Sequence, residues 1–301
     1  MARYSIYPCT FDDGTDRDIT QIESFSVQTG GNKSAIVPGG AVDRAHIGLG
    51  SARPMASFGT RDLAGFFGFA SATAGLACTS GATFRLQQRS DGSTFATGTS
   101  HETYSSTKGF LRPTSLSASQ DDDSGALLNC DYYALWDGST DPWVHNSSVN
   151  YSTAPTPAFA SRFFLGPVYH TSSQLASIER WSIDFGINYQ PKAFNGEPYP
   201  KIGSIVTRTP TVTFTTADAN VGTTLDMFIA GIVTDMSLYL QKGASNADRV
   251  AAATTEHLKI SFSAGAWCID EASVSGNEDG TVSFSAQPTG SISLSVASAI
   301  P

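Results

Sequence analysis

The sequence predicts a mainly β protein built as two tandem copies of one domain, each a β-sandwich or half-barrel with a short α-helix. Apolar and polar residues alternate strictly in several segments, among them 258–264, 282–286 and 292–297. This period of two is typical of strands with one buried face. Gly- and Asp-rich turn sequences such as 121–125 and 276–280 separate these segments, as expected between the strands of a sheet.

An internal repeat is the second observation. Residues 53–63, RPMASFGTRDL, and 209–219, TPTVTFTTADA, share the pattern Pro, three residues, Phe, one residue, Thr, one residue, Asp. The repeat signature comprises Pro54, Phe58, Thr60 and Asp62 in the first copy and Pro210, Phe214, Thr216 and Asp218 in the second. At this offset of 156, ten of the 41 positions from 22 to 62 are identical without a gap, whereas unrelated chains of this composition would share roughly two or three. A period this long indicates whole domains.

The length of 301 residues suits two domains of about 150 residues each. We expect a first domain at 1–136 and a second at 159–301. Between them, 137–158 is rich in Pro, Ser, Thr and Asn, which favours a linker or surface excursion over an element of the fold.

Three segments favour short helices. Thr60 and Thr216 precede helical patterns in 60–71 and 216–228 and could act as N-caps. The third segment, 244–258, predicts one or two helical turns.

The composition argues against several classes of function. The chain has 27 acidic and 18 basic residues, a net charge of −9, and no cluster of Lys or Arg, which argues against a nucleic-acid-binding surface. No run of 18 apolar residues predicts a membrane helix, and the first residues lack the apolar run of a secretion signal. We expect Cys9, Cys78, Cys130 and Cys268 to be reduced thiols, with only Cys78 and Cys268 in strongly apolar surroundings.

No catalytic or metal site emerges from the sequence. The GxSxG motif is absent, and GLGSAR at 48–53 lacks the third glycine of a dinucleotide loop. The five histidines form no metal-binding pair, and the acidic runs 11–20 and 119–126 do not form a convincing Ca²⁺ loop. The prediction is a protein that is not an enzyme and that needs no cofactor or metal.

Two long segments, 28–54 and 184–210, are equal in length and poorly patterned. Loops of this length inside compact domains are usually functional. Their apolar residues predict docking onto another protein. The residues concerned are Ile36, Val37, Val42 and Ile47 in the first segment and Tyr189, Phe194, Tyr199 and Ile202 in the second.

RPMASFGTRDLAGFF, which follows such a segment, and the later pattern VSGNEDGTVSFSA resemble the tail tube (major tail) proteins of long-tailed bacteriophages. The second copy departs from the pattern at Ala219, Asn220 and Val221, where the first has Leu-Ala-Gly. The resemblance implies trimeric rings with pseudo-sixfold symmetry, because internally duplicated members replace the hexamers of other members. It also implies that the long segments reach the neighbouring ring.

The same resemblance implies that the protein is made in the host cytoplasm and ends in the virion tail. Its partners would be its own copies and the tape-measure, tail-terminator and baseplate proteins. DNA would pass through the lumen without specific binding, and no membrane would be involved. Whether the tail contracts, and whether the ring is the tube or a terminator or distal ring, stays open.

The edges of an alternating sheet must be closed, covered or blunted, and pairing around a ring is one closure. Four inward-facing strands per domain would give about 24 strands in a three-chain ring. Such a ring carries three times −9, or −27 charges, and acidic groups in the lumen would repel DNA.

The alternative function is a carbohydrate- or receptor-binding β-sandwich of the virion, a decoration or spike protein. Trp136, Trp143 and the Tyr-rich segment 130–138 could stack on sugars. Core or interface packing is the ordinary role of such aromatic residues. A hydrolase on a β-sandwich is disfavoured, because no acid pair or triad stands out.

Overall fold

In this computed structural model, fourteen segments of the chain are described, and every structural statement below refers to them: 3–6, 8–31, 33–36, 46–49, 52–89, 98–151, 162–218, 220–221, 232–233, 235–244, 248–263, 265–273, 280–289 and 292–301. The account is limited to the backbone for 3–6, 33–36, 46–49, 88–89, 98–100, 151, 232–233 and 267–273.

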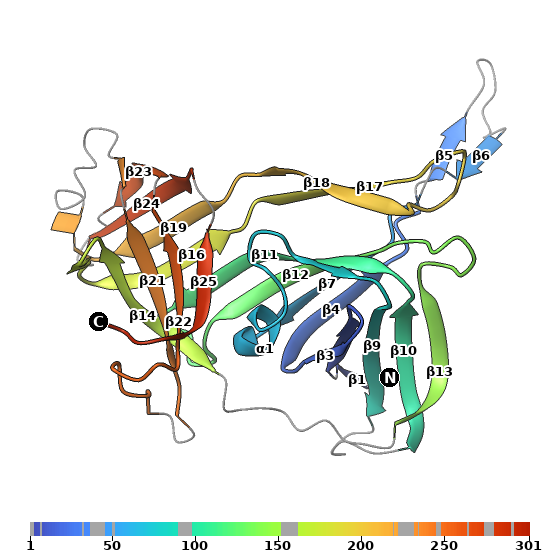
Figure 1. The fold of residues 1–301 in the computed structure, drawn as a ribbon, viewed down its shortest axis with the longest axis horizontal. Coiled ribbons are helices and arrows are strands. Elements are labelled where there is room, and N and C mark those ends of the chain that lie inside the picture. Colours follow the sequence, from blue (N-terminus) through green and yellow to red (C-terminus); the bar gives the residue numbers. More distant parts are fainter. Residues whose placement is uncertain are drawn as a thin grey trace.

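The structure is mainly β, with 61% strand and 3% helix, which confirms the predicted mainly β class. The alternating segments are strands, and all the strand pairs are antiparallel (Figure 1). The strands form several open sheets, of which the largest has ten strands.

The ten-stranded sheet runs through both halves of the sequence. Its order is β20-β23-β24-β19-β16-β11-β12-β7-β4, with β8 paired to β11 beside this path. The strands are β20 (Ile232–Val233), β23 (Gly265–Ser273), β24 (Thr281–Pro288), β19 (Thr211–Thr216), β16 (Ile178–Asp184), β11 (Gly109–Ser119), β12 (Leu127–Ala134), β7 (Met55–Thr60), β4 (Ile22–Gln28) and β8 (Leu76–Cys78).

Two smaller sheets contain most of the remaining strands. One has the order β13-β10-β9-β2-β3, with β1 on β9: β13 (Val144–Tyr151), β10 (Gly98–Ser106), β9 (Gly81–Arg89), β2 (Cys9–Asp12), β3 (Asp16–Ile19) and β1 (Arg3–Ile6). The other has the order β15-β14-β21-β22-β25: β15 (Ser173–Gln174), β14 (Phe163–His170), β21 (Met236–Lys242), β22 (His257–Phe262) and β25 (Ser293–Ser298).

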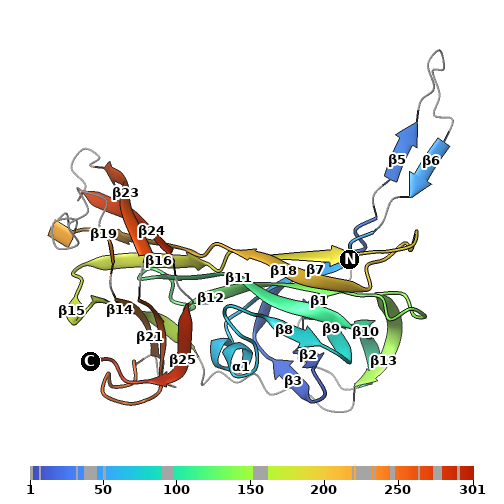
Figure 2. The same cartoon turned by 45° about the horizontal axis from the view of Figure 1, so that its top comes forward.

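The long segments 28–54 and 184–210 contain two-stranded hairpins, so the expectation of irregular loops is wrong. The first arm consists of β5 (Lys33–Ile36) and β6 (His46–Leu49), and the second arm of β17 (Ile187–Lys192) and β18 (Ile202–Arg208). The first arm stands away from the body, whereas the second lies along the ten-stranded sheet (Figure 2).

A glycine marks the base of each arm. Gly30 has φ +63° and Gly186 has φ +58°. A Cβ at either position would lie 2.1 Å from a carbonyl oxygen of the returning chain, that of Arg53 or Thr209. Each glycine therefore supplies both the left-handed turn and the close approach that start the arm.

Helix α1 (Leu63–Phe67) confirms the helix expected in 60–71, but its N-cap is Asp62 rather than Thr60. In 216–228 only residues 216–218, 220 and 221 are described, and 220–221 are helical. The helix expected over 244–258 is wrong for 248–256, where a turn bonds Thr254 N to Ala251 O at 3.0 Å. The segment 137–158 is not merely a linker, because β13 pairs with β10; residues 152–158 lie outside the described segments.

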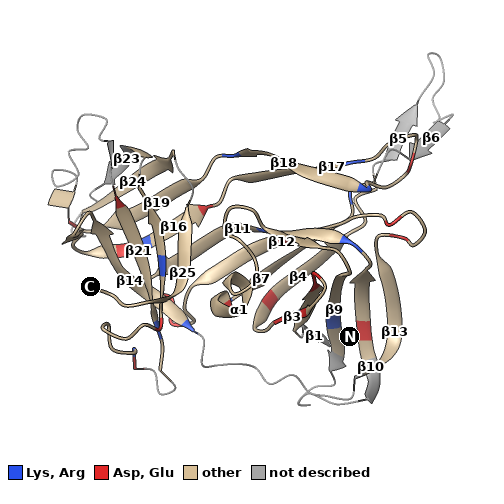
Figure 3. Cartoon of the chain, in the orientation of Figure 1, with Lys and Arg blue, Asp and Glu red and all other residues tan. Residues whose placement is uncertain are grey.

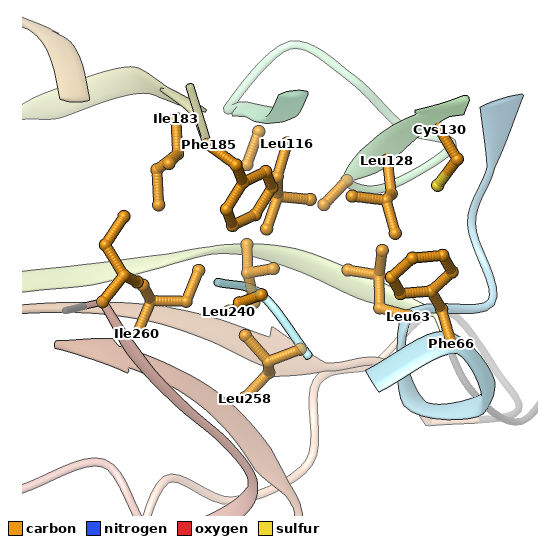
Figure 4. Close-up of a cluster of buried hydrophobic side chains, with 14 of the residues drawn as sticks. Leu63, Phe66, Leu116, Leu128, Cys130, Ile183, Phe185, Leu240, Leu258 and Ile260 are labelled. Atoms are coloured by element: carbon orange, nitrogen blue, oxygen red, sulfur yellow. The ribbon is translucent and has the colours of Figure 1, made fainter. Parts of the chain in front are cut away.

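The core lies between the ten-stranded sheet and the elements beneath it. Leu63 and Phe66 of α1 lie near Leu128 and Cys130 of β12, and Leu240, Leu258 and Ile260 face the sheet near Leu116 and Ile183 (Figure 4). Side chains from both halves of the sequence belong to one buried cluster. Its apolar burial supplies the main driving force for folding.

Three cysteines, Cys9, Cys78 and Cys130, are free thiols buried in this core. Burial raises the pKa of all three thiols, that of Cys78 to about 12. The expectation that Cys9 and Cys130 lack apolar surroundings is therefore wrong. Cys268 lies where only the backbone is described.

Candidate assembly interface

The two halves of the ten-stranded sheet meet where β11 pairs with β16. Five residue pairs form this joint, from Ser115 opposite Asp184 to Ser119 opposite Arg180. On the core side, Leu116 and Ile183 are 0% exposed and Trp181 is 2% exposed. We call this β11–β16 pairing the intrachain joint.

Each end of the ten-stranded sheet leaves strand edge without a partner in the described segments. β4 is the last strand at one end. At the other end β20 pairs with Gly265 and Ala266 of β23, and none of the described strands lies beside the rest of that edge, up to Ser273. Open edges present unpaired N–H and C=O groups and favour pairing with another chain. β4, with the sequence IESFSVQ, contains neither the Lys nor the Pro that often blunts an edge.

The second arm packs across the first half of its own chain. The Tyr189 ring stacks on Phe110, with centroids 4.1 Å apart and planes 10° apart, and lies 5.2 Å from the Tyr133 ring. Burial raises the pKa of Tyr189 to about 12. Arg112 donates one hydrogen bond to the carbonyl of Ile187 and another to Asp131 at 2.7 Å.

Further along this arm, a polar and aromatic contact fixes the loop that leads into β18. The Lys201 ammonium lies 4.6 Å from the centre of the Trp136 ring, a cation–π geometry. Trp136 N donates to Pro200 O at 2.8 Å. Lys108 Nζ donates to Lys201 O at 3.2 Å. The arm is therefore tied to the first half along much of its length.

The residues predicted to dock onto another ring differ in how far they are buried within their own chain. Tyr189 is only 7% exposed, and the centres of the Tyr199 and Trp136 rings lie 6.4 Å apart, so both tyrosines pack within the chain. Phe194 and Ile202 are 46% and 50% exposed. In the first arm, Ile36 and Ile47 are placed by backbone alone, and Val37 and Val42 lie outside the described segments.

The repeat signature occupies matching local structures. Thr60 Oγ1 donates to Thr20 O at 2.9 Å and accepts from Asp62 N at 3.0 Å. Thr216 Oγ1 donates to Ala176 O at 2.9 Å and accepts from Asp218 N at 3.0 Å. Phe58, on β7, and Phe214, on β19, are buried, as is Pro54, while Pro210 is half-buried. The signature residues therefore hold strand ends and core.

The face of the ten-stranded sheet opposite the core is rich in hydroxyl groups. Ser182 and Thr213 are hydrogen bonded across strands at 2.7 Å. Ser57 donates to Asp131 at 2.8 Å, and Arg112 pairs with the same carboxylate. Most of this sheet is uncharged (Figure 3).

The aromatic and acidic candidates for other functions are engaged within the chain. Trp143 packs 5.7 Å from the rings of both Phe84 and Tyr132. Both Trp143 and Trp136 are half-buried. In the acidic runs, Asp12 accepts from Gly14 N at 2.8 Å, and Asp122 pairs with Arg61 at 3.2 Å.

Within the described segments, no group of three or more His, Cys, Asp or Glu side chains could hold a metal ion. None of the helices there has the length and apolar character needed to cross a membrane. No model of a known protein family matches the chain, and the search of curated proteins found no significant match.

Proposed function

We propose that the protein is a tail tube subunit of a long-tailed bacteriophage, a tandem duplication that assembles into stacked three-chain rings. The strand order carries the proposal. The ten-stranded sheet reads β23-β24-β19-β16 and then β11-β12-β7-β4. Adding 156 to the bounds of β4 and β7 gives the bounds of β16 and β19.

The register of these strands supports the same duplication. The β11–β12 pairing shifts register between Pro113 and Ser115, and the β23–β24 pairing shifts between Ile269 and Glu271, both 156 residues later. The β4–β7 and β16–β19 pairings shift at Ile22 and Ile178 in the same way. Bulges re-aim a strand at one defined residue, so matching bulges are specific evidence for common descent of the halves.

The smaller sheets support it as well. Their orders, β13-β10-β9-β2-β3 and β25-β22-β21-β14-β15, correspond strand by strand. The arms correspond too, because Lys33 opposite Leu49 becomes Tyr189 opposite Ile205 when 156 is added to each.

Ring formation follows from the two open edges. β16 of the second half pairs with β11 of the first. The open edges are β4, the counterpart of β16, and β23, the counterpart of β11. One chain's β4 can therefore pair with β23 of the next chain in a head-to-tail interface, which forms a ring if the rotation closes. Closure removes the exposed edges by making one barrel, and the resemblance to duplicated tail tube proteins sets three chains.

The sheet face opposite the core would line the bore. Binding to DNA depends on Lys and Arg that neutralise phosphates. On this face Arg112 is paired with Asp131, and Arg180 donates to Thr215 Oγ1 at 3.1 Å. Hydroxyl groups and the Arg112–Asp131 ion pair give this face little net positive charge, which suits passage of DNA without specific binding.

Electron microscopy of the purified chain, with sizing by light scattering, tests the proposal. We expect rings or tubes, because three chains bury both open edges. Val27→Glu should prevent assembly, since the counterpart Ile183 is 0% exposed and a charge there would be buried. Val27→Ile is the matched control, because the counterpart position on β16 carries Ile183. A folded wild-type chain that stays monomeric at every concentration would contradict the proposal.

A further inference from the structure

One part of the open edge of β23 corresponds to the residues of β11 that pair with β16. In the first half, β8 pairs with Gly109–Leu111 of β11, and β16 pairs further along, with Ser115–Ser119. In the second half, β20 pairs with Gly265 and Ala266, the counterparts of Gly109 and Phe110. The stretch that corresponds to the β16-pairing residues of β11 therefore begins at Glu271. The first three residues of this stretch, 271–273, belong to β23.

We infer that β4 of one copy pairs with β23 of the next in a single register, with Gln28 opposite Glu271, Val27 opposite Ala272 and Ser26 opposite Ser273. This inference rests on the proposed ring and adds the residues that form it. The register is that of the intrachain joint, where Asp184, Ile183 and Ser182 lie opposite Ser115, Leu116 and Ser117. Each β4 residue is 156 before its counterpart on β16, and each β23 residue is 156 after its counterpart on β11.

Burial on β4 agrees with a missing neighbour. In the intrachain joint Trp181 is 2% exposed and Ile183 is 0% exposed. Their counterparts Phe25 and Val27 are only half-buried, although Phe25 already stacks on Phe84 at 4.8 Å. A strand laid along β4 would cover the apolar side chains that remain partly in water. The second copy of this chain is the occupant whose edge has the matching register.

The two joints differ in what reinforces them. Beside the intrachain joint, the Tyr189 ring stacks on Phe110 and lies 5.2 Å from the tilted ring of Tyr133. The corresponding positions of the interchain joint carry Lys33, Ala266 and Gln287. The aromatic contact is therefore not reproduced in the sequence. We expect the intrachain joint to persist in an isolated chain, whereas the interchain joint forms only when two copies meet.

Cysteine cross-linking tests the register. The variant Ser26→Cys/Ser273→Cys is made in a Cys268→Ser background and treated with oxidant or a short thiol-to-thiol cross-linker. Directly opposite residues bring Cβ atoms close to the separation that a disulfide needs. We expect reversible covalent dimers and trimers on non-reducing gels. The intrachain control, Ser117→Cys/Ser182→Cys, joins the counterpart positions within one chain. It should cross-link without forming covalent dimers or trimers on the gel.

An off-register variant, Ser26→Cys/Glu271→Cys, should cross-link far less than the in-register pair. If rings form but the in-register pair fails while the intrachain control succeeds, the register is wrong and the proposed function stands. The register would also be wrong, and the proposed function would stand, if the off-register pair cross-linked more efficiently than the in-register pair. If the wild-type chain forms no ring, the proposed function and this inference both fail.

Discussion

Replacing Asp62 by alanine is expected to lower the free energy of unfolding by about 3 kcal/mol. Asp62 is 6% exposed. Its carboxylate accepts hydrogen bonds from Thr20 N at 3.0 Å, Thr20 Oγ1 at 2.6 Å and Gly65 N at 2.9 Å. Hydrogen bonds to charged groups contribute roughly 1.5–3 kcal/mol each, and an N-cap about 1 kcal/mol. We expect a loss smaller than the sum of these contributions, because Thr20 and the helix end are partly exposed and can bind water in the variant.

Urea unfolding followed by tryptophan fluorescence measures this change. With a slope of about 2 kcal/mol per molar urea, the loss corresponds to a midpoint lower by roughly 1.5 M. Asp218→Ala is the matched control. Asp218 accepts from Asn220 N at 2.9 Å in an exposed setting, so we expect a loss of at most about 1 kcal/mol. An Asp62→Ala loss below about 1 kcal/mol, or equal to that of the control, would refute the reasoning.

Three further predictions follow from the buried groups. Tyr189→Ala should speed hydrogen exchange of the second arm, because the stacked contact is lost, while Tyr189→Phe should not; equal exchange in both variants would contradict the packing. Cys9, Cys78 and Cys130 should resist a thiol reagent in the folded chain, and denaturation without reductant should release four thiols, Cys268 included; a count of two or zero would be contrary. The free energy of unfolding should fall as the pH rises from 9 towards 12, because the raised pKa values of Cys78 and Tyr189 keep these groups protonated when folded while the unfolded chain ionises; a constant urea midpoint across this range would contradict it.

Strand identity could be predicted where one face is buried. The β24 residues Val282, Phe284 and Ala286 are buried and alternate with half-buried polar residues, and this pattern is visible in the sequence. β13 was missed because it is an edge strand whose described side chains are mostly exposed, so burial imposes little alternation. The apolar signal that did exist there was Trp143, which packs into the core.

The sequence of the second arm contains a strand pattern, although it lies within a segment long enough to resemble a loop. Ile187 and Tyr189 are buried and alternate with exposed Asn188 and Gln190, the period expected of a strand. Its docking site could not be predicted, because Phe110 lies 79 positions away from Tyr189 in the sequence. The burial of Cys130 was also readable, since it alternates with Leu128 and Tyr132 on the core face of β12.

The assembly edges could not be identified from the sequence, because an edge is defined by which strands are neighbours in space. The repeat offset indicates that β4 and β16 are counterparts. It does not indicate that β16 is paired with β11 while β4 is left open. That difference depends on the long-range connection between the halves, and it is the feature from which the ring is inferred.

A cryo-electron microscopy map of the assembled protein, at a resolution that separates strands, would show whether neighbouring chains pair through β4 and β23. We expect three chains of 31.7 kDa per ring and a continuous antiparallel sheet in which β4 of each chain lies beside β23 of the next. We also expect the hydroxyl-rich face of the sheet to line the bore. A ring in which β4 and β23 are both without a strand partner, or a preparation that contains only single chains, would contradict the proposed ring.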